Sequence, residues 1–252
     1  MMSAGQSGED NNRLTSSLST PKNTLKVGCW IVRTMYQTGR TAQVVNEMKR
    51  YNIDILGISE CRWTKTGKMK LTSGETILYS RRNDGNHRND VAIILSKDAT
   101  KCLDEWTPIN DRIITARFWS KYIKTTVIQV YSPTNEADAD DKNIFVEQLQ
   151  AVMQRTSKHD LLVLLGDWNT KIGAMQYGEE GTVGRHGVIC ERNDNDDRFV
   201  EICGIINMAI TTTMFPHKEI HKLSWTSPDG SYQNQIDHVA INSKFKRSFA
   251  RR

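Results

Sequence analysis

The segment 161–165, with the sequence LLVLL, is apolar at every position and does not alternate with polar residues. A strand with this pattern is buried on both faces, so it belongs inside a sheet that is covered from both sides. Further apolar runs bounded by turn-forming residues recur through the chain and predict more strands. These predicted strands are residues 25–31, 54–58, 77–79, 91–95, 113–119, 126–131, 208–212 and 236–241.

Helical spacing of apolar residues is found in a few places between these runs. Residues 140–155 place Phe145, Leu149 and Val152 at i, i+4 and i+7, which predicts a helix with one apolar face. The other predicted helices are residues 41–50 and 197–203. Several predicted strands follow one another with no helix between them, unlike the strands of a doubly wound sheet. The order fits an α/β sandwich in which two mixed sheets pack together and helices cover the outside.

Composition indicates the cellular compartment and the possible partners of this protein, but not the reaction that it carries out. The 252 residues include 34 Lys and Arg against 29 acidic residues, a formal charge of +5 that is compatible with a polyanion such as nucleic acid. The five cysteines include no C-x-x-C pair, which disfavours a zinc site or a disulfide framework and fits a reduced intracellular setting. We expect residues 1–24 to be a disordered polar leader rather than a secretory signal, and residues 25–252 to form one domain. No segment approaches the roughly 20 apolar residues that cross a bilayer.

The sequence Gly-Asp-Trp-Asn at 166–169 directly follows the apolar segment 161–165. If strand geometry continues, Asp167 and Asn169 lie two residues apart and point to the same side of the sheet. A carboxylate beside an amide makes a base or metal ligand next to a hydrogen-bonding group. A plain turn explains the same four residues equally well, because Gly, Asp and Asn favour turns.

Polar residues also follow or begin three other predicted strands. Glu60 comes after an apolar strand and is a candidate ligand for a cation such as Mg²⁺, although this residue taken alone favours a solvated surface Glu. Tyr131 and Asn135 close another strand and are candidate phosphate contacts, or else a buried Tyr before a Pro turn. Asp237 lies in a late strand and is able to orient a histidine or to anchor a loop. His238 is not a candidate, because adjacent strand residues point to opposite faces.

Five ordered motifs together resemble the endonuclease/exonuclease/phosphatase superfamily. They are WIVRTM (30–35), GISECRW (57–63), VIQVYSPTNEAD (127–138), LLGDWNTKIG (164–173) and SWTSPDGSYQNQIDHVAIN (224–242). Within that superfamily the chain is most similar to the endonuclease domain of RTE-type (BovB-like) non-LTR retrotransposons, which craniofacial development protein 2-like proteins share. The resemblance implies a four-layer α/β sandwich of two mixed sheets flanked by helices. It also implies hydrolysis of phosphate esters with Mg²⁺ or Mn²⁺.

The resemblance assigns the metal ligands and part of the catalytic set. Glu60 matches the metal-binding Glu of the family. Asp167 matches the Asp that activates or positions the attacking water, and Asn169 matches the Asn that stabilises the transition state. The predicted metal site is therefore Glu60, Asp167 and Asn169.

The remaining assigned residues concern the phosphate and a histidine. Tyr131 matches the Tyr that contacts the scissile phosphate, and Asn135 lies near enough in sequence to assist it. Asp237 matches the Asp that orients the catalytic His of the family. The predicted catalytic residues are Tyr131, Asp167, Asn169 and Asp237, and the predicted phosphate contacts are Tyr131 and Asn135.

The chain departs from the family pattern in several places. Ile31 stands where the family has a metal-associated Asn, and its alkyl group makes no hydrogen bond, which lowers metal affinity about 10–100-fold. The Ser-Asp-His motif and its strand are expected after the last strands, and the sequence reaches Arg252 before that motif, so we expect activity and folding to be impaired. Asp90 and Asp196 replace glycines that we expect to need positive φ, and we interpret both as drift.

Two functions remain open on these grounds, with a third behind them. The first is a metal-dependent DNA endonuclease, nuclear because its partner is DNA, without an organic cofactor or a membrane. The second is a catalytically inactive module of the same fold that binds nucleic acid or protein, which Ile31 and the expected loss of the histidine favour. The third is a phosphatase or sphingomyelinase, which the SWTSPDG segment disfavours because it resembles the DNA-cleaving branch.

Overall fold

The structure is a computed structural model of residues 1–252. It describes residues 18, 24–32, 35, 39–61, 66–81, 90–188, 190–216, 218, 224–226 and 233–248. Most of the predicted polar leader lies outside these residues, so its disorder stays a prediction. Leu18 is described, and it is buried against the cluster of apolar side chains between the two sheets.

The first sheet has five strands in the order β1-β2-β5-β4-β3. The strands are β1 (Val27–Ile31), β2 (Ile55–Ser59), β3 (Gly67–Lys70), β4 (Thr76–Ser80) and β5 (Val91–Leu95). β1 runs parallel to β2 and the other neighbours are antiparallel, so the sheet is mixed. β2 and β5 lie inside it and are buried at every residue, which explains why their sequences, ILGIS and VAIIL, are so apolar.

The second sheet has six strands in the order β10-β13-β9-β8-β7-β6. The strands are β6 (Leu103–Pro108), β7 (Ile113–Phe118), β8 (Thr125–Tyr131), β9 (Leu161–Asp167), β10 (Met208–Ile210) and β13 (Asp237–Asn242). β8 and β9 are parallel, and the other neighbouring pairs are antiparallel. β9 contains the segment 161–165 and lies between β8 and β13, as expected for a strand without polar alternation. A small separate pair joins β11 (Trp225–Thr226) to β12 (Gln233–Asn234).

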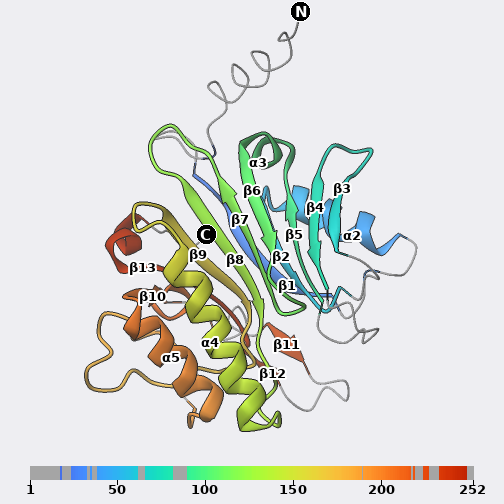
Figure 1. Ribbon diagram of the computed structural model, residues 1–252. Helices are drawn as coiled ribbons and strands as arrows, with labels where there is room; N and C mark the ends of the chain where they lie inside the picture. Colours follow the sequence, from blue (N-terminus) through green and yellow to red (C-terminus); the bar gives the residue numbers. More distant parts are fainter. Residues whose placement is uncertain are drawn as a thin grey trace, which may run out of the picture.

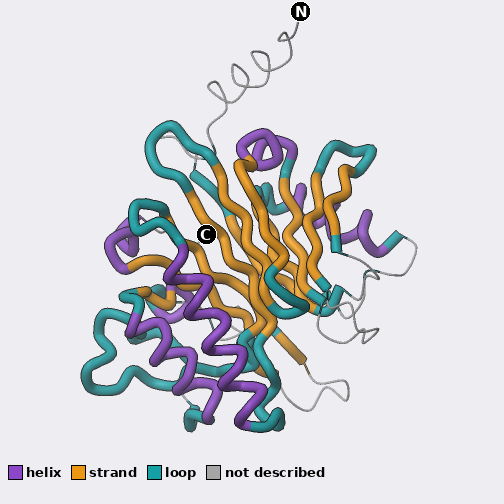
Figure 2. Tube along the Cα trace, in the orientation of Figure 1, coloured by secondary structure: helices purple, strands orange, loops and turns teal. Residues whose placement is uncertain are grey.

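The sheets pack face to face and carry helices on their outer faces (Figure 1, Figure 2). Ile55, Ile93, Val127 and Leu165 belong to the apolar cluster between the sheets. A second cluster joins the six-stranded sheet to α4 (Ala139–Arg155) and α5 (Asp194–Ile205), and a third joins the five-stranded sheet to α2 (Arg40–Arg50). Two mixed sheets flanked by helices are therefore confirmed.

The helices α4 and α5 start at residues whose side chains satisfy free backbone N–H groups of the first turn. The Asp138 side chain accepts a hydrogen bond from the N–H of Asp141 at the start of α4. Asn193 and Asp196 form a reciprocal capping box at the start of α5. Both helices begin near the carboxyl ends of β8 and β9, so their first turns lie beside the loops that follow these strands (Figure 1).

The predicted helices and most predicted strands agree with the structure to within a few residues. Among the described residues, the elements that were not predicted are β3, β6, the short helix α3 (Lys97–Cys102), the short strands β11 and β12, and a 3₁₀ helix at Ser243–Ser248. β3 and β6 are edge strands with few buried residues, so they lack the apolar runs that identified the others. The strand predicted at 208–212 ends at Ile210 and continues as a 3₁₀ turn.

Two further observations concern the described residues only. Within them, no helix has the length and apolar character needed to cross a membrane. All five cysteines lie among them, and none forms a disulfide.

Candidate active site

Three adjacent strands place three predicted site residues in one row across the sheet. Tyr131 at the end of β8 is the register partner of Asp167 at the end of β9. Asp167 is in turn the register partner of Asp237 at the start of β13. Register partners lie on the same face of a sheet with their side chains about 5 Å apart. The hydroxyl and the two carboxylates are therefore neighbours, although they are far apart in sequence.

Glu60 reaches this row from the other sheet. It directly follows β2 and has a φ of 60°, an uncommon conformation for a residue with a side chain. The hydroxyl of Tyr131 donates a hydrogen bond to Oε1 of Glu60, with an O–O distance of 3.1 Å. The predicted metal ligand and the predicted phosphate contact are thus in direct contact, and the site spans both sheets.

The GDWN motif reaches the site through a turn and not through continued strand geometry. β9 ends at Asp167, and Asn169 has a φ of 50°, so strand geometry does not continue to Asn169 and the alternative of a turn describes the backbone here. The turn still keeps them close, because the N–H of Asn169 donates to Oδ1 of Asp167 at 2.9 Å. Gly166 precedes them with a φ of 146°, and a Cβ there would lie 2.0 Å from the carbonyl oxygen of Val130.

Asn169 has its amide fixed by the loop after β8. Its Nδ2 donates to the carbonyl oxygen of Ser132 at 3.0 Å, while the N–H of Ser132 donates to the carbonyl oxygen of Asp167 at 2.9 Å. With Nδ2 bonded in this way, Oδ1 of Asn169 points away from Ser132 and remains as an acceptor. The two loops at the carboxyl ends of β8 and β9 are joined through these residues.

The carboxylate of Asp237 lies where both sheets and a third segment meet. Hydrogen bonds from the side chains of Ser224 and Cys29 lower its pKa, but burial has the larger effect and raises the pKa to about 7. Oδ1 of Asp237 is buried and has no hydrogen-bond partner. The Ser224 hydroxyl also accepts from the backbone N–H groups of Ile236 and Asp237, at 3.0 and 3.2 Å.

Asp167 is the most buried carboxylate of the row, with 2% of its surface exposed. Burial raises its pKa well above the usual range, and the charge of Asp237 raises it further. The N–H of Asn169 opposes this shift, whereas the charge of Glu60 adds to it. Because the charges of Asp237 and Glu60 disfavour the ionised form of Asp167, a bound cation is favourable at this site.

The donor atoms of this site suit a hard divalent cation. Glu60, Asp167 and Asn169 offer only oxygen ligands, which Mg²⁺ and Mn²⁺ prefer. Across the described parts of the chain, no three His, Cys, Asp or Glu side chains come close enough to form a ready cage for a metal. Mg²⁺ commonly binds through one or two carboxylates and keeps several waters, so this arrangement fits it.

Two residues beside Tyr131 and Asn135 were not identified from the sequence. Arg112 donates from Nη1 to the carbonyl oxygen of Tyr131 at 3.1 Å, and its guanidinium lies 5.5 Å from the centre of the Tyr131 ring. Lys142 is buried, and its Nζ donates to the carbonyl oxygen of Asn135 at 2.8 Å and contacts Asp194 at 3.1 Å. Both cations lie close to predicted phosphate contacts. No pattern in the sequence distinguishes them from ordinary surface Arg and Lys.

Asn135 itself lies in the exposed turn between β8 and α4. Its carbonyl oxygen accepts the hydrogen bond from Lys142. The predicted role of its side chain in phosphate binding stays a prediction. The pKa of the Tyr131 hydroxyl is raised by burial first and by the charges of Glu60 and Asp167 next, so this hydroxyl remains a hydrogen-bond donor.

A polar bridge between the sheets lies below Glu60. Gln129 is fully buried, and its Nε2 donates to Oγ of Ser59 at 3.1 Å. Gly57 makes room for it, because a Cβ there would lie 1.8 Å from Oε1 of Gln129. The absence of a side chain at position 57 therefore allows a β8 side chain to contact the residue that precedes Glu60.

The departures from the family pattern have different structural settings. Ile31 ends β1 as the register partner of Ser59, beside Glu60, so its alkyl group lies at the site end of the sheet. Asp90 and Asp196 both lack positive φ, so the expectation of a glycine conformation was wrong. Asp196 caps α5 and accepts from the N–H of Lys171 at 2.7 Å, which contradicts its interpretation as drift.

Asp90 is buried next to the turn that contains Glu60. Its carbonyl oxygen accepts from the N–H of Cys61, and neither carboxylate oxygen has a hydrogen-bond partner. Burial raises its pKa to about 6; the charge of Arg81 opposes this shift and that of Asp111 adds to it. Nothing in the structure explains why an aspartate stands at this position.

His238 lies on the opposite face of β13 from Asp237, as strand alternation predicted. It is fully buried, with Nδ1 2.9 Å from Oγ1 of Thr212 and Nε2 3.0 Å from the carbonyl oxygen of Thr170. Its ring faces Phe199 in the cluster under α5. These contacts give it a structural role.

The two-sheet sandwich and the order of the motifs along the chain agree with the comparison with known proteins. Residues 36–251 match the Endonuclease/Exonuclease/phosphatase family, and the chain belongs to that family. It is 37% identical over 244 residues to Craniofacial development protein 2 of Bos taurus, a match that includes 97% of this chain. The chain spans about 40% of the length of that relative.

Solved structures share the fold at low sequence identity. The endonuclease domain of TRAS1, a telomere-specific non-LTR retrotransposon, superposes with a TM-score of 0.59 at 16% identity, covering 88% of this chain and 87% of that one. The 3′ phosphatase NExo from Neisseria, bound to a product DNA hairpin, gives a TM-score of 0.59 at 17% identity, with 89% of both chains covered. At these identities the likeness establishes the fold alone.

Proposed function

We propose that this chain is a divalent-metal-dependent DNA endonuclease domain of retrotransposon origin that nicks phosphodiester bonds. One observation carries the proposal: Tyr131, Asp167 and Asp237 occupy one row across three strands, and Glu60 contacts that row from the other sheet. The fold it shares with a retrotransposon endonuclease and with a phosphatase bound to DNA supports the same substrate class. A DNA substrate implies a nuclear location.

Each residue has a distinct task in this proposal. Glu60, Asp167 and Asn169 hold Mg²⁺ or Mn²⁺, which supplies charge neutralisation at the scissile phosphate when bound. Tyr131 donates a hydrogen bond to a phosphate oxygen, and Asn135 contacts the phosphate from the adjacent turn. Asp167 positions the attacking water.

The raised pKa values agree with these tasks. Metal-free Asp167 retains a proton more readily than an exposed carboxyl, and a bound cation would favour its ionised form. Asp237 adjoins it with an unpartnered Oδ1 that is able to orient a proton-carrying group. Arg112 adds positive charge beside Tyr131, whereas the charge of Lys142 is paired with Asp194.

One observation favours a second function, a nucleic-acid- or protein-binding module without catalysis. Ile31 places an alkyl group beside Ser59 and Glu60, where it provides no hydrogen bond to a metal or to its ligands. Loss of such a partner weakens metal binding about 10–100-fold. A protein whose metal site is weakened in this way is able to keep its fold and its affinity for DNA while it loses catalytic activity.

Plasmid nicking separates the two functions. Supercoiled plasmid is incubated with the protein in Mg²⁺ or Mn²⁺, with and without EDTA, next to the variants Asp167→Ala and Ile31→Asn. An endonuclease converts supercoiled plasmid to open circles only with metal, loses this activity in Asp167→Ala and gains activity in Ile31→Asn. If DNA is retarded in a gel while no protein nicks it, the binding module is supported and the endonuclease proposal fails.

A further inference from the structure

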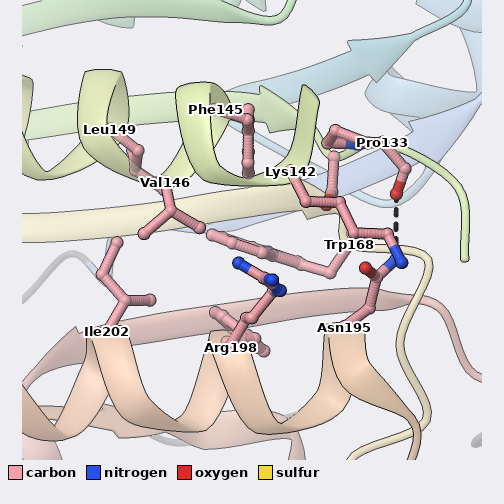
Figure 3. Close-up of a pocket in the computed structure, with 11 residues that line it drawn as sticks. Pro133, Lys142, Phe145, Val146, Leu149, Trp168, Asn195, Arg198 and Ile202 are labelled. Carbon is pink, nitrogen blue, oxygen red and sulfur yellow. Dashed lines mark hydrogen bonds between the residues drawn. The ribbon is translucent and has the colours of Figure 1, made fainter. Parts of the chain in front are cut away.

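The first turn of α5 contacts both loops that carry the candidate site. Nδ2 of Asn195 donates to the carbonyl oxygen of Pro133 at 2.9 Å, in the loop that follows β8. One residue later, Oδ1 of Asp196 accepts from the N–H of Lys171 at 2.7 Å, in the loop that follows β9. Figure 3 shows the bond between Asn195 and Pro133 at the edge of the pocket between α4 and α5.

These contacts continue directly into the site. Pro133 is bonded to Ser132, whose carbonyl oxygen accepts from Nδ2 of Asn169 and whose N–H donates to the carbonyl oxygen of Asp167. A change in the position of Pro133 therefore changes the hydrogen bond that orients the Asn169 amide. α5 is therefore able to influence the orientation of the Asn169 amide without any of its side chains contacting a phosphate or a metal.

The first turn of α5 is itself rigidly placed. Asn195 and Asp196 are 4% and 0% exposed, and the capping box holds the helix start. Trp168, between the two predicted ligands, stacks on Phe199 of α5 with ring centres 3.8 Å apart. Figure 3 shows Trp168 lying between the two helices. The helix start and the loop thus have a fixed relative position.

We infer that Asn195 is a positioning residue for the endonuclease site, acting through Ser132 on Asn169. The catalytic part of this inference rests on the proposed function. Its structural part rests on the hydrogen bonds alone. The Nδ2 donor of Asn195 keeps the loop after β8 at the distance at which the Asn169 amide is bonded to Ser132. Oδ1 of Asn169 is then left as an acceptor.

The test removes the Asn195 donor in two ways. Asn195→Asp keeps the shape of the side chain but places an acceptor opposite the Pro133 carbonyl oxygen, and Asn195→Ala removes the group altogether. Asn143→Ala is the matched control, because it cuts a bond between α4 and α5, from Arg198 to Asn143 at 2.7 Å, without touching either loop. Ile202→Val is a second control that weakens only packing under α5.

Residue-resolved amide hydrogen exchange is measured first. Both Asn195 variants are expected to speed exchange at the N–H groups of Ser132 and Asn169 about tenfold or more, while amides of β2 and β5 keep their protection. Neither control changes these two amides selectively. If exchange at Ser132 and Asn169 equals that of the parent, or if protection falls evenly across the protein or the variants do not fold, Asn195 has only a structural role and the inference is wrong.

Mn²⁺ binding and DNA nicking are then measured on the same proteins. The Kd for Mn²⁺ is expected to rise about tenfold in the Asn195 variants, and kcat to fall with KM for DNA unchanged. Controls keep the parent values. If the parent neither binds Mn²⁺ nor nicks DNA, the proposed function fails, and the exchange measurement alone still decides whether Asn195 positions the loops.

Discussion

The hydroxyl of Tyr131 and Oε1 of Glu60 lie 3.1 Å apart and are joined by a hydrogen bond from one sheet of the sandwich to the other. Tyr131 also has Asp167 as its neighbour in the row across its own sheet. The site therefore depends on the separation of the two sheets at one end. The buried contact between Gln129 and Ser59 lies directly below and sets this separation with a second polar bond.

Removing the Tyr131 hydroxyl tests this bond. The variant Tyr131→Phe keeps the ring and its contact with Arg112, so we expect a loss of stability of only about 1 kcal/mol. Metal-dependent nicking is expected to fall about 10–100-fold, because both a phosphate contact and a partner of Glu60 are lost. Plasmid relaxation measures the activity, and thermal melting measures the stability. Tyr122→Phe, at a side chain that is 64% exposed, is the control and keeps the parent values.

Restoring a polar group at position 31 is expected to strengthen metal binding. Ile31→Asn places an amide beside Ser59 and Glu60, and the Kd for Mn²⁺ is expected to fall about tenfold. Titration calorimetry measures this change, and Ile31→Val controls for the loss of apolar volume. An unchanged Kd in Ile31→Asn, with the fold intact, shows that this position does not influence the metal.

The carboxylate row predicts how the stability of the metal-free protein depends on pH. Burial raises the pKa of Asp237 from 3.8 to about 7, and it raises that of Asp167 as well. Above the ordinary carboxyl pKa the folded protein thus holds protons that the unfolded chain has released. The free energy of unfolding is therefore expected to fall as pH rises from about 4 to 7.

Urea unfolding in EDTA measures this dependence, with Asp167→Asn as the comparison. The variant removes one of the mutually repelling charges, so its free energy of unfolding at about pH 8 is expected to exceed that of the parent. Since one pKa unit corresponds to about 1.4 kcal/mol, the gain is expected to be on the order of 1 kcal/mol. Parallel pH profiles for the two proteins contradict the assignment of the raised pKa to this row.

Gly166 is expected to be intolerant of any side chain. Its φ of 146° and the 2.0 Å approach of a Cβ to the Val130 carbonyl oxygen leave no room in the backbone of β8. Gly166→Ala is expected to destabilise the protein by about 3 kcal/mol or more, measured by chemical denaturation. Gly181→Ala has nothing within 4 Å of its Cβ and is expected to change stability by less than about 1 kcal/mol. Equal effects of the two substitutions contradict this prediction.

Much of the fold was predictable because apolar runs mark buried strands. β5, with the sequence VAIIL, was predicted with its observed bounds, because a strand that is buried on both faces is apolar at consecutive positions. β3 and β6 were missed for the converse reason, because edge strands alternate weakly and expose polar residues. Their place is determined by pairing with β4 and β7, which lie elsewhere in the sequence.

The candidate site was predictable in its members but not in its geometry. Local motifs singled out Glu60, Asp167 and Asn169, whereas the row across β8, β9 and β13 follows from strand register, which no local pattern specifies. Asp196 shows the limit of reasoning from a family pattern. It stands where glycine was expected, yet its carboxylate caps α5 and bonds the loop after β9.

The row across β8, β9 and β13 has a consequence for the order of events in folding. Its three residues come from distant parts of the chain, so each pairing closes a long loop before any contact is gained. Such non-local pairings form slowly compared with helices such as α4 and α5. The carboxylates meet only once β13 has docked beside β9, so the charge repulsion between them arises late in folding.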